Sequence, residues 1–177
     1  VDREGKTVLD AIMNLNQPPI FPVDLRTTAQ ADISHQSLPK EGELEFHGVS
    51  VEWMEVWHPG GCSAFAFQIG DKRIVFSGDV ELNRTDRDAL IDFSKDADVL
   101  IMDSQYTEQE YSDHLGWGHS THLQAASFAD DAEVGRLLLT HHDPAHDDDF
   151  LEGMVKDSKR IFAETEAARD RMLVLSS

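Results

Sequence analysis

The sequence predicts an α/β fold with two layers of sheet and helices on the outside. Strand patterns come first: between residues 43 and 79, apolar and polar residues alternate around two turns, which predicts two β-hairpins. After residue 79, buried-strand patterns alternate with amphipathic helices, as in βαβ units. Sheets with such connections gather functional residues at the carboxyl ends of their strands, so a site is expected there.

The chain divides into a connecting segment and a folded domain. Residues 1–42 show no regular pattern, and the stretch PPIFP carries three prolines, which favours extended chain. We therefore expect an irregular segment over residues 1–42 and one domain over residues 43–177.

The elements of the domain each have a local signal. The first hairpin covers residues 43–58 with its turn at His47–Gly48, and the second covers residues 63–79 with its turn near Gly70–Asp71. Helix and strand patterns then alternate. They are a helix over 86–95, a buried strand over 97–104, a stretch over 119–132 that opens with a Ser/Thr cap pair and continues as a helix, a buried strand over 133–142, a long helix over 147–170 with acids in its first turn, and a strand over 171–177.

The composition restricts the class of partner. The chain carries 34 acidic and 15 basic residues, a formal net charge of −19. Nucleic-acid binders need a cationic surface to displace counterions from phosphates, and the nearest thing to a basic cluster, KDSKR at 156–160, has the pattern of a solvated helix face. Nucleic acid is therefore not expected to be the main partner, whereas the charge attracts cations.

The apolar pattern and the cysteine content bear on location. No apolar stretch approaches the roughly 20 residues that a membrane span needs, and the first residues do not have the pattern of a signal peptide. The single cysteine, Cys62, cannot form an internal disulfide or a cysteine-based zinc cluster, and we expect it to be a small buried apolar residue. A reducing compartment, the cytoplasm, is the expected location, without membrane association.

Polar residues follow four of the predicted apolar strands. They are His58 after WMEVW, Asp79 after RIVFSG, Asp103 after DVLIM and His141 after RLLLT. Four such strand ends together predict a site. Histidine nitrogen with carboxylate oxygen suits zinc, iron or manganese, and Asp79, between two histidine-bearing strand ends, is the candidate to bridge two such ions.

Five motifs, in order, resemble a known family. WHPGG, FSGDV, ADVLIMDSQY, GHSTHLQAA and LLLTHHDP are similar to the second half of the metallo-β-lactamase fold hydrolases, nearest the branch with ribonuclease Z and small cyclic phosphodiesterases; the similarity covers residues 45–151. The resemblance implies an αββα four-layer sandwich with a dinuclear metal site at a sheet edge. It also implies that residues 43–177 hold only the C-terminal half of this fold, and that residues 1–42 are a mid-protein connection.

The resemblance assigns roles to individual residues. His58 is similar to a ligand of one metal ion, Asp79 to the bridging ligand, and His141 to a ligand of the second ion. His119, in GHST, resembles the histidine that contacts the scissile phosphate and protonates the leaving oxygen, which is general-acid work.

The neighbours of these residues allow more than one interpretation. Strand alternation points His142 away from His141, so His142 either supports the site, contacts substrate or is simply exposed. Asp143 could hydrogen-bond a ligand histidine from behind. Plainer roles are expected for the remaining candidates: a solvated helix start for His146 and Asp147 to Asp149, a structural role for His122, a site-rim position for Asp103 and a loop position for His114.

One expected motif is missing from the chain. The family carries HxHxDH in its first half, which supplies further metal ligands, and His35 in DISHQS has no such neighbours. Either this chain is the C-terminal half of a longer protein, or it is a half-site that has lost its metal. The abrupt start and the irregular first residues favour a longer protein, in which an N-terminal segment or chain carries HxHxDH.

These observations predict a metal-dependent hydrolase of a phosphodiester or similar small ester. Two metal ions, zinc first and manganese or iron as alternatives, would share a hydroxide that attacks a small-molecule substrate. A homodimer is compatible with the sequence. Two alternatives stay open: a catalytically inactive, metal-free binding or regulatory module of the same fold, and a ribonuclease Z-like nuclease, against which the net charge of −19 counts.

Overall fold

The computed structural model describes residues 8–15, 19, 21–22 and 38–175. The chain divides into two units, Val1–Pro39 and Lys40–Ser177. In the first unit, α1 (Val8–Leu15) is a helix where the sequence predicted irregular chain, because its apolar residues recur at the spacing of one helix face. His35 and part of PPIFP lie outside the described residues.

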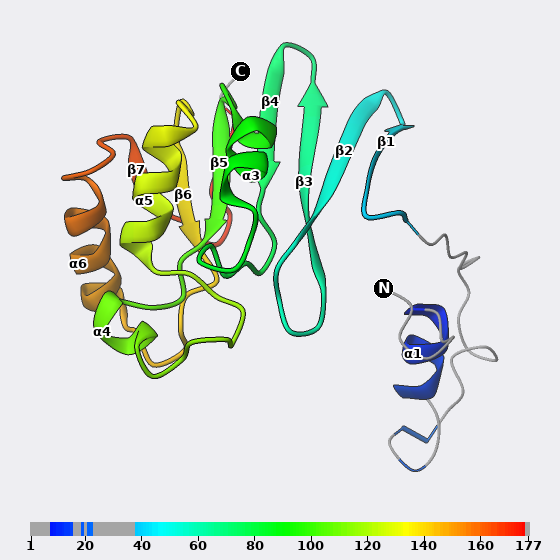
Figure 1. Ribbon diagram of the computed structural model, residues 1–177, viewed down its shortest axis with the longest axis horizontal. Coiled ribbons are helices and arrows are strands. Elements are labelled where there is room, and N and C mark those ends of the chain that lie inside the picture. Colours follow the sequence, from blue (N-terminus) through cyan, green and yellow to red (C-terminus); the bar gives the residue numbers. More distant parts are fainter. Residues whose placement is uncertain (1–7, 16–18, 20, 23–37, 176–177) are drawn as a thin grey trace. The chain divides into compact units, whose positions relative to one another are not determined.

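The second unit is built on one seven-stranded mixed sheet whose strands lie side by side in chain order (Figure 1). Strands β1 to β4 pair antiparallel, and strands β4 to β7 pair parallel. The predicted α/β class is confirmed. The strands are β1 (Glu41–Phe46), β2 (Val49–Val56), β3 (Cys62–Ile69), β4 (Lys72–Phe76), β5 (Val99–Asp103), β6 (Leu137–Thr140) and β7 (Thr165–Ala167).

Both predicted hairpins are confirmed. The turn between β1 and β2 has positive φ at His47 (51°) and at Gly48 (81°), the pattern of a tight two-residue hairpin turn whose twist matches the strands. The turn between β3 and β4 begins at Gly70, also with positive φ (62°). Glycine and short polar residues adopt this conformation at low cost, which is why the turn residues were readable from the sequence.

Helices connect the parallel strands. α3 (Arg87–Ser94) starts behind Asp86, whose side chain accepts a hydrogen bond from a first-turn amide, and it agrees with the predicted helix. α5 (His122–Asp131) starts directly after the predicted Ser/Thr cap, where Thr121 and Gln124 form a capping box. The short α4 (Glu108–Tyr111) and α6 (Asp148–Ser158) complete the set.

The C-terminal elements differ from those predicted. The long helix expected over 147–170 is wrong beyond Ser158, because β7 occupies the second part of that range. Thr165 and Ala167 are buried and pair with Leu137 and Leu139 of β6, so the sheet edge overrides the helical pattern. The strand expected over 171–177 is also wrong for residues 171–175, which are irregular.

The core lies between one face of the sheet and the helices, and in Figure 1 α3 and α5 lie in front of the strands. Helix α5 contacts β5, β6 and α6, and α6 contacts β7. Fully buried side chains here include Ala66, Val75, Leu100, Leu139 and Phe128. The alternate residues of β3 and β4, among them Phe65, Ile74 and Phe76, belong to the opposite face and are only partly buried.

The two sheet layers expected from the sequence are not both present among the described residues, whose long strands all join one sheet. None of the described helices has the length and apolar character of a membrane span.

Candidate metal centre

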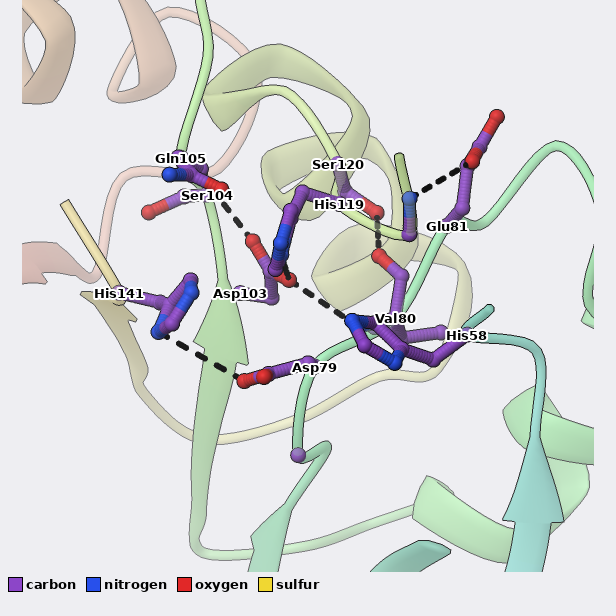
Figure 2. A network of polar contacts seen from close by, with 12 residues as sticks. His58, Asp79, Val80, Glu81, Asp103, Ser104, Gln105, His119, Ser120 and His141 are labelled. Atoms are coloured by element: carbon purple, nitrogen blue, oxygen red, sulfur yellow. Dashed lines mark hydrogen bonds and ion pairs between the residues drawn. The ribbon is translucent and has the colours of Figure 1, made fainter. Parts of the chain in front are cut away.

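One edge of the sheet collects the predicted site residues. Strands β2, β4, β5 and β6 all run in the same direction, so their carboxyl ends meet at one edge. His58 follows β2, Asp79 follows β4, Asp103 ends β5 and His141 follows β6. Figure 2 shows their side chains turned toward one another, with His119 from the loop before α5 among them. The strand-end convergence expected from the sequence is therefore observed.

Three of these residues form a potential metal-binding group. One donor atom each from Asp79, His119 and His141 lies within 4.8 Å of the others. The His141 Nδ1 atom is 3.6 Å from the Asp79 Oδ1 atom, and the His119 and His141 rings stack with centroids 4.7 Å apart. Two imidazoles and a carboxylate at this spacing fit a divalent ion such as zinc, manganese or iron.

His58 lies beside this group and is not one of its three members. Its ring meets the His119 ring edge-on at a centroid distance of 5.4 Å. Its Nδ1 atom accepts a hydrogen bond from the Gly60 amide at 3.2 Å, which leaves Nε2 as the nitrogen free for another contact. The ligand role predicted for His58 stays a prediction, and the grouping of His119 with Asp79 and His141 was not expected.

The position of Asp79 depends on a glycine. Gly78 has a φ of +62°, and a Cβ atom there would lie 2.6 Å from the Cys62 Sγ atom and 2.8 Å from the Ser63 carbonyl oxygen. Only glycine fits this close approach without displacing the chain. Cys62 is partly buried, and burial raises the pKa of its thiol, in keeping with the packing role expected from the sequence.

His119 is held by a buried carboxylate. Because a carboxylate only accepts, the His119 Nδ1–H group donates to the Asp103 Oδ2 atom, at 2.7 Å. Asp103 is 1% exposed and also accepts from the Val80 amide at 3.0 Å. The site-rim position expected for Asp103 is therefore wrong, because Asp103 is buried against the His119 ring. Its position at the end of a strand did not indicate this contact.

Two opposing effects set the protonation of His119. Burial of the ring lowers its pKa, whereas the hydrogen bond and charge of Asp103, with the charges of Asp79 and Glu81, raise it, and the net pKa lies above the ordinary histidine value. With Nδ1 bonded to Asp103, the Nε2 atom is the one available to a ligand or substrate.

The loop after β6 differs from the prediction. Strand β6 ends at Thr140, and His141 has a φ of +59°, so strand alternation does not decide where His142 points. Both ring nitrogens of His142 are buried without a hydrogen-bond partner among the described residues, and burial, together with the neighbouring histidines, lowers its pKa. Asp143 accepts from the Ala145 amide in a local turn, and its predicted bond to a ligand histidine stays a prediction.

Three further histidines, His146, His122 and His114, have packing contacts away from the metal-binding group. The solvated position predicted for His146 is wrong: its side chain is 4% exposed, its Nε2 atom is 2.8 Å from a Glu110 carboxylate oxygen, and its ring stacks on Phe150. The helix start itself is confirmed, since Asp147 caps α6. His122 is buried, as expected of a structural residue, and His114 stacks on Tyr106 in its loop.

Sequence reasoning missed Glu81. This carboxylate is 0% exposed and accepts hydrogen bonds from the Tyr111 hydroxyl and from the Gly116 and Gly118 amides. A single acid in a turn-like stretch gives no periodic signal, and the donors that hydrogen-bond to its carboxylate lie 30 or more positions later in the chain. Only the close presence of Asp79 two residues earlier could have drawn attention to it.

Comparisons with known proteins identify the family of the chain. Residues 8–142 match the family described as the beta-lactamase superfamily domain. The chain is 35% identical over 103 residues to ribonuclease Z of Brevibacillus brevis, covering 56% of this chain and 31% of that protein. It is 32% identical over 117 residues to the probable metallo-hydrolase YhfI of Bacillus subtilis, covering 64% of this chain and 43% of that protein. The chain thus spans less than half the length of these relatives.

Solved structures share the fold. The crystal structure of YhfI from Bacillus subtilis aligns with a TM-score of 0.65 at 26% identity, covering 76% of this chain and 52% of that one. The short form of human tRNase Z aligns with a TM-score of 0.58 at 20% identity, covering 75% of this chain and 46% of that one, which shows a likeness of fold alone.

Proposed function

Because the chain belongs to the metallo-β-lactamase superfamily, we propose that it is a metal-dependent hydrolase of a phosphodiester or similar small ester. The observation that carries the proposal is the placement of a carboxylate-bonded imidazole, His119, within the same 4.8 Å group as Asp79 and His141. Metal donors and a proton donor thus stand side by side, which hydrolysis of an ester with a poor leaving group requires.

The donor atoms define what ion the centre would hold. We propose zinc, with manganese or iron as alternatives, since imidazole and carboxylate suit all three. Asp79 can offer both carboxylate oxygens and is the proposed bridge between two ions, with His141 on one of them and His58 on the other. A bound ion would lower the pKa of its water and offset negative charge on the substrate.

His119 is the proposed general acid. Asp103 fixes the Nδ1 proton and the ring orientation, so the Nε2 atom can carry a second proton toward the departing oxygen. In the absence of a bound ion, the pKa of His119 lies above the ordinary histidine value, because the hydrogen bond and charge of Asp103, with the charges of Asp79 and Glu81, outweigh burial. His142 and Asp143, in the loop beside His141, are proposed to support the site or to contact substrate.

Further ligands are proposed to come from an HxHxDH motif on a separate segment or chain. With His119 as the acid, this chain would offer Asp79, His141 and His58 as ligands, which are too few for two ions. A second sheet packed on the Phe65, Ile74 and Phe76 face would complete an αββα sandwich, because that apolar face is only partly buried among the described residues.

A nuclease is the second candidate function. The similarity to ribonuclease Z of Brevibacillus brevis supports it. The net charge of −19 opposes it, because phosphates of a long nucleic acid are repelled by an acidic surface. Comparing hydrolysis of a structured RNA with that of bis-p-nitrophenyl phosphate would separate the two, and we expect turnover of the small diester alone.

The test of the proposed function is hydrolysis of bis-p-nitrophenyl phosphate with zinc, manganese or iron(II) added. We expect His119→Gln to lower kcat by about 10²–10⁴-fold, the usual contribution of a general acid. His47→Asn, in the remote hairpin turn, is the matched control, because asparagine also tolerates the positive φ found there. Activity that survives in His119→Gln at the wild-type level would remove His119 from the mechanism. No turnover with any metal, in a protein that also carries the HxHxDH segment, would favour the inactive binding module.

A further inference from the structure

Glu81 is a buried carboxylate whose oxygens accept hydrogen bonds mainly from Tyr111, the last residue of α4, and from the loop that follows it. Its Oε1 atom accepts from the Tyr111 hydroxyl at 2.9 Å and from the Gly116 amide at 3.0 Å, and its Oε2 atom accepts from the Gly118 amide at 3.0 Å. Arg84 lies 3.4 Å away. Burying a carboxylate is costly unless its oxygens are satisfied, so this arrangement fixes the loop backbone strongly.

The loop held in this way, residues 112–118, packs against the His58 imidazole at Gly118. Gly118 has a φ of +101°, and a Cβ atom there would lie 2.3 Å from the His58 Cδ2 atom and 2.9 Å from its Nε2 atom. The Gly118 backbone therefore lies directly against the imidazole edge that carries Nε2. Glu81 binds the amide of this same residue, so it acts on His58 through one intervening glycine.

The chain is also fixed on the other side of His119. The Ser120 hydroxyl donates to the Val80 carbonyl oxygen at 2.6 Å and accepts from the Leu82 amide at 3.1 Å. The segment that follows Asp79 thus holds the residues both before and after His119, as Figure 2 shows for Val80, Glu81 and Ser120. Asp79, His58 and His119 are tied together by this one short segment.

We propose, on the basis of the proposed function, that Glu81 is a positioning residue: through residues 112–118 its carboxylate sets where the His58 and His119 imidazoles stand at the metal centre. The chemistry requires two acceptor oxygens, because each of them meets at least one N–H or O–H donor. Glutamine has the same size but only one acceptor oxygen. Its amide nitrogen would face either Gly118 or the Tyr111 and Gly116 pair, and the loop would loosen.

The test compares Glu81→Gln with Glu52→Gln in the full chain. Glu52 is the matched control, because it also accepts two side-chain hydrogen bonds, from Arg73, but belongs to β2 away from the loop. We expect Glu81→Gln to weaken zinc binding, measured by chelator competition, by about 10–100-fold, the usual effect of losing support behind a ligand. We also expect kcat for bis-p-nitrophenyl phosphate to fall while KM stays near the wild-type value. Glu52→Gln should leave both quantities unchanged.

A purely structural role for Glu81 predicts a different result. Glu81→Gln would then lower the melting temperature but, at temperatures where it is folded, would bind zinc and turn over substrate as the wild type does, which would overturn the proposal. If Glu81→Gln does not fold, Gly118→Ala replaces it, since this change keeps the Glu81 carboxylate and displaces His58 directly. Wild-type zinc affinity in Gly118→Ala would equally overturn the proposal.

The positioning proposal and the proposed function fail in distinguishable ways. If the wild-type protein binds no zinc and hydrolyses nothing even when it also carries the HxHxDH segment, the proposed function fails. The contact between Glu81 and the loop is then tested by hydrogen exchange of the Gly116 and Gly118 amides. Exchange should be faster in Glu81→Gln than in the wild type. Unchanged exchange at both amides would show that Glu81 does not hold the loop.

Discussion

His119 and Asp103 form the contact on which the proposed chemistry depends most. The Asp103 carboxylate accepts a hydrogen bond from the His119 Nδ1–H group at 2.7 Å. It also accepts hydrogen bonds from the backbone amides of Val80 and Gln105. Such a pair fixes the tautomer of the imidazole and favours its charged form. The contact with Asp103 should therefore be measurable directly, as a change in the protonation of the His119 ring.

We predict that Asp103→Asn lowers the pKa of His119. In the metal-free wild type, the ring should titrate above the ordinary histidine value of 6.5, because the hydrogen bond and charge of Asp103, with the charges of Asp79 and Glu81, together outweigh burial. The asparagine removes the charge of Asp103, leaving burial as the larger effect. Histidine ring signals followed by NMR from about pH 5 to about pH 9, on both sides of the ordinary histidine pKa, and assigned through His119→Gln, measure the change. A titration midpoint that does not move would show that Asp103 does not govern the ring.

The same shift predicts how stability depends on pH. A pKa raised in the folded state means that the Asp103–His119 contact stabilises most below the ordinary histidine value of 6.5 and less as pH rises through the folded pKa. The stability lost in Asp103→Asn should therefore be larger at acidic than at alkaline pH. Urea unfolding of both proteins on each side of neutrality measures it, and a loss that grows with pH would contradict the assignment.

We predict that Gly78→Ala is destabilising by about 1–3 kcal/mol, the usual cost of inserting a methyl group into packed surroundings. The new Cβ atom would lie 2.6 Å from the Cys62 Sγ atom, at a φ of +62° that alanine does not favour. Gly153→Ala, in α6 with no atom within 4 Å of the added methyl group, is the control and should stabilise by about 1 kcal/mol. Equal effects in urea unfolding would show that Gly78 is not under steric constraint.

Helix α6 shows how an element is defined by its ends. Asp147 accepts from the Phe150 amide and caps the helix, while Asp149 lies within the first turn. We predict that Asp147→Ala costs about 1 kcal/mol of stability, the typical value for a cap. Asp149→Ala should cost only about 0.3 kcal/mol, since it loses the helix-dipole interaction alone. Urea unfolding compares them, and the reverse order would mean that the helix starts elsewhere.

Elements that carry their own signal could be predicted from the sequence. The two hairpins, α3 and β5 follow from turn residues, caps and apolar runs that act over a few positions. Residues 159–170 could not be predicted in this way. Their composition suits a helix, but pairing with β6 makes part of them a strand, and that partner lies more than twenty positions earlier.

Across the whole molecule, the site could be predicted only as far as topology determines it. Strand direction brings His58, Asp79 and His141 to one edge, so their convergence followed from the order of elements. The contacts of Asp103, Glu81 and His146 did not follow. Each depends on a partner 16 or more positions away, and no local pattern specifies such a pair.

Metal binding at the sheet edge by Asp79, with His141 and His58, is the central claim for the molecule as a whole. The net charge of −19 attracts cations in general, so specific binding must be separated from surface binding. Asp79→Ala removes the carboxylate shared by the group, and the exposed Asp92→Ala removes the same charge from α3 and serves as the control.

Elemental analysis of the three proteins, after equilibration with zinc and exhaustive dialysis, tests the claim most directly. We predict that the wild type and Asp92→Ala retain zinc and that Asp79→Ala retains none. Equal zinc content in Asp79→Ala and the wild type would contradict the assignment of this sheet edge as the metal centre.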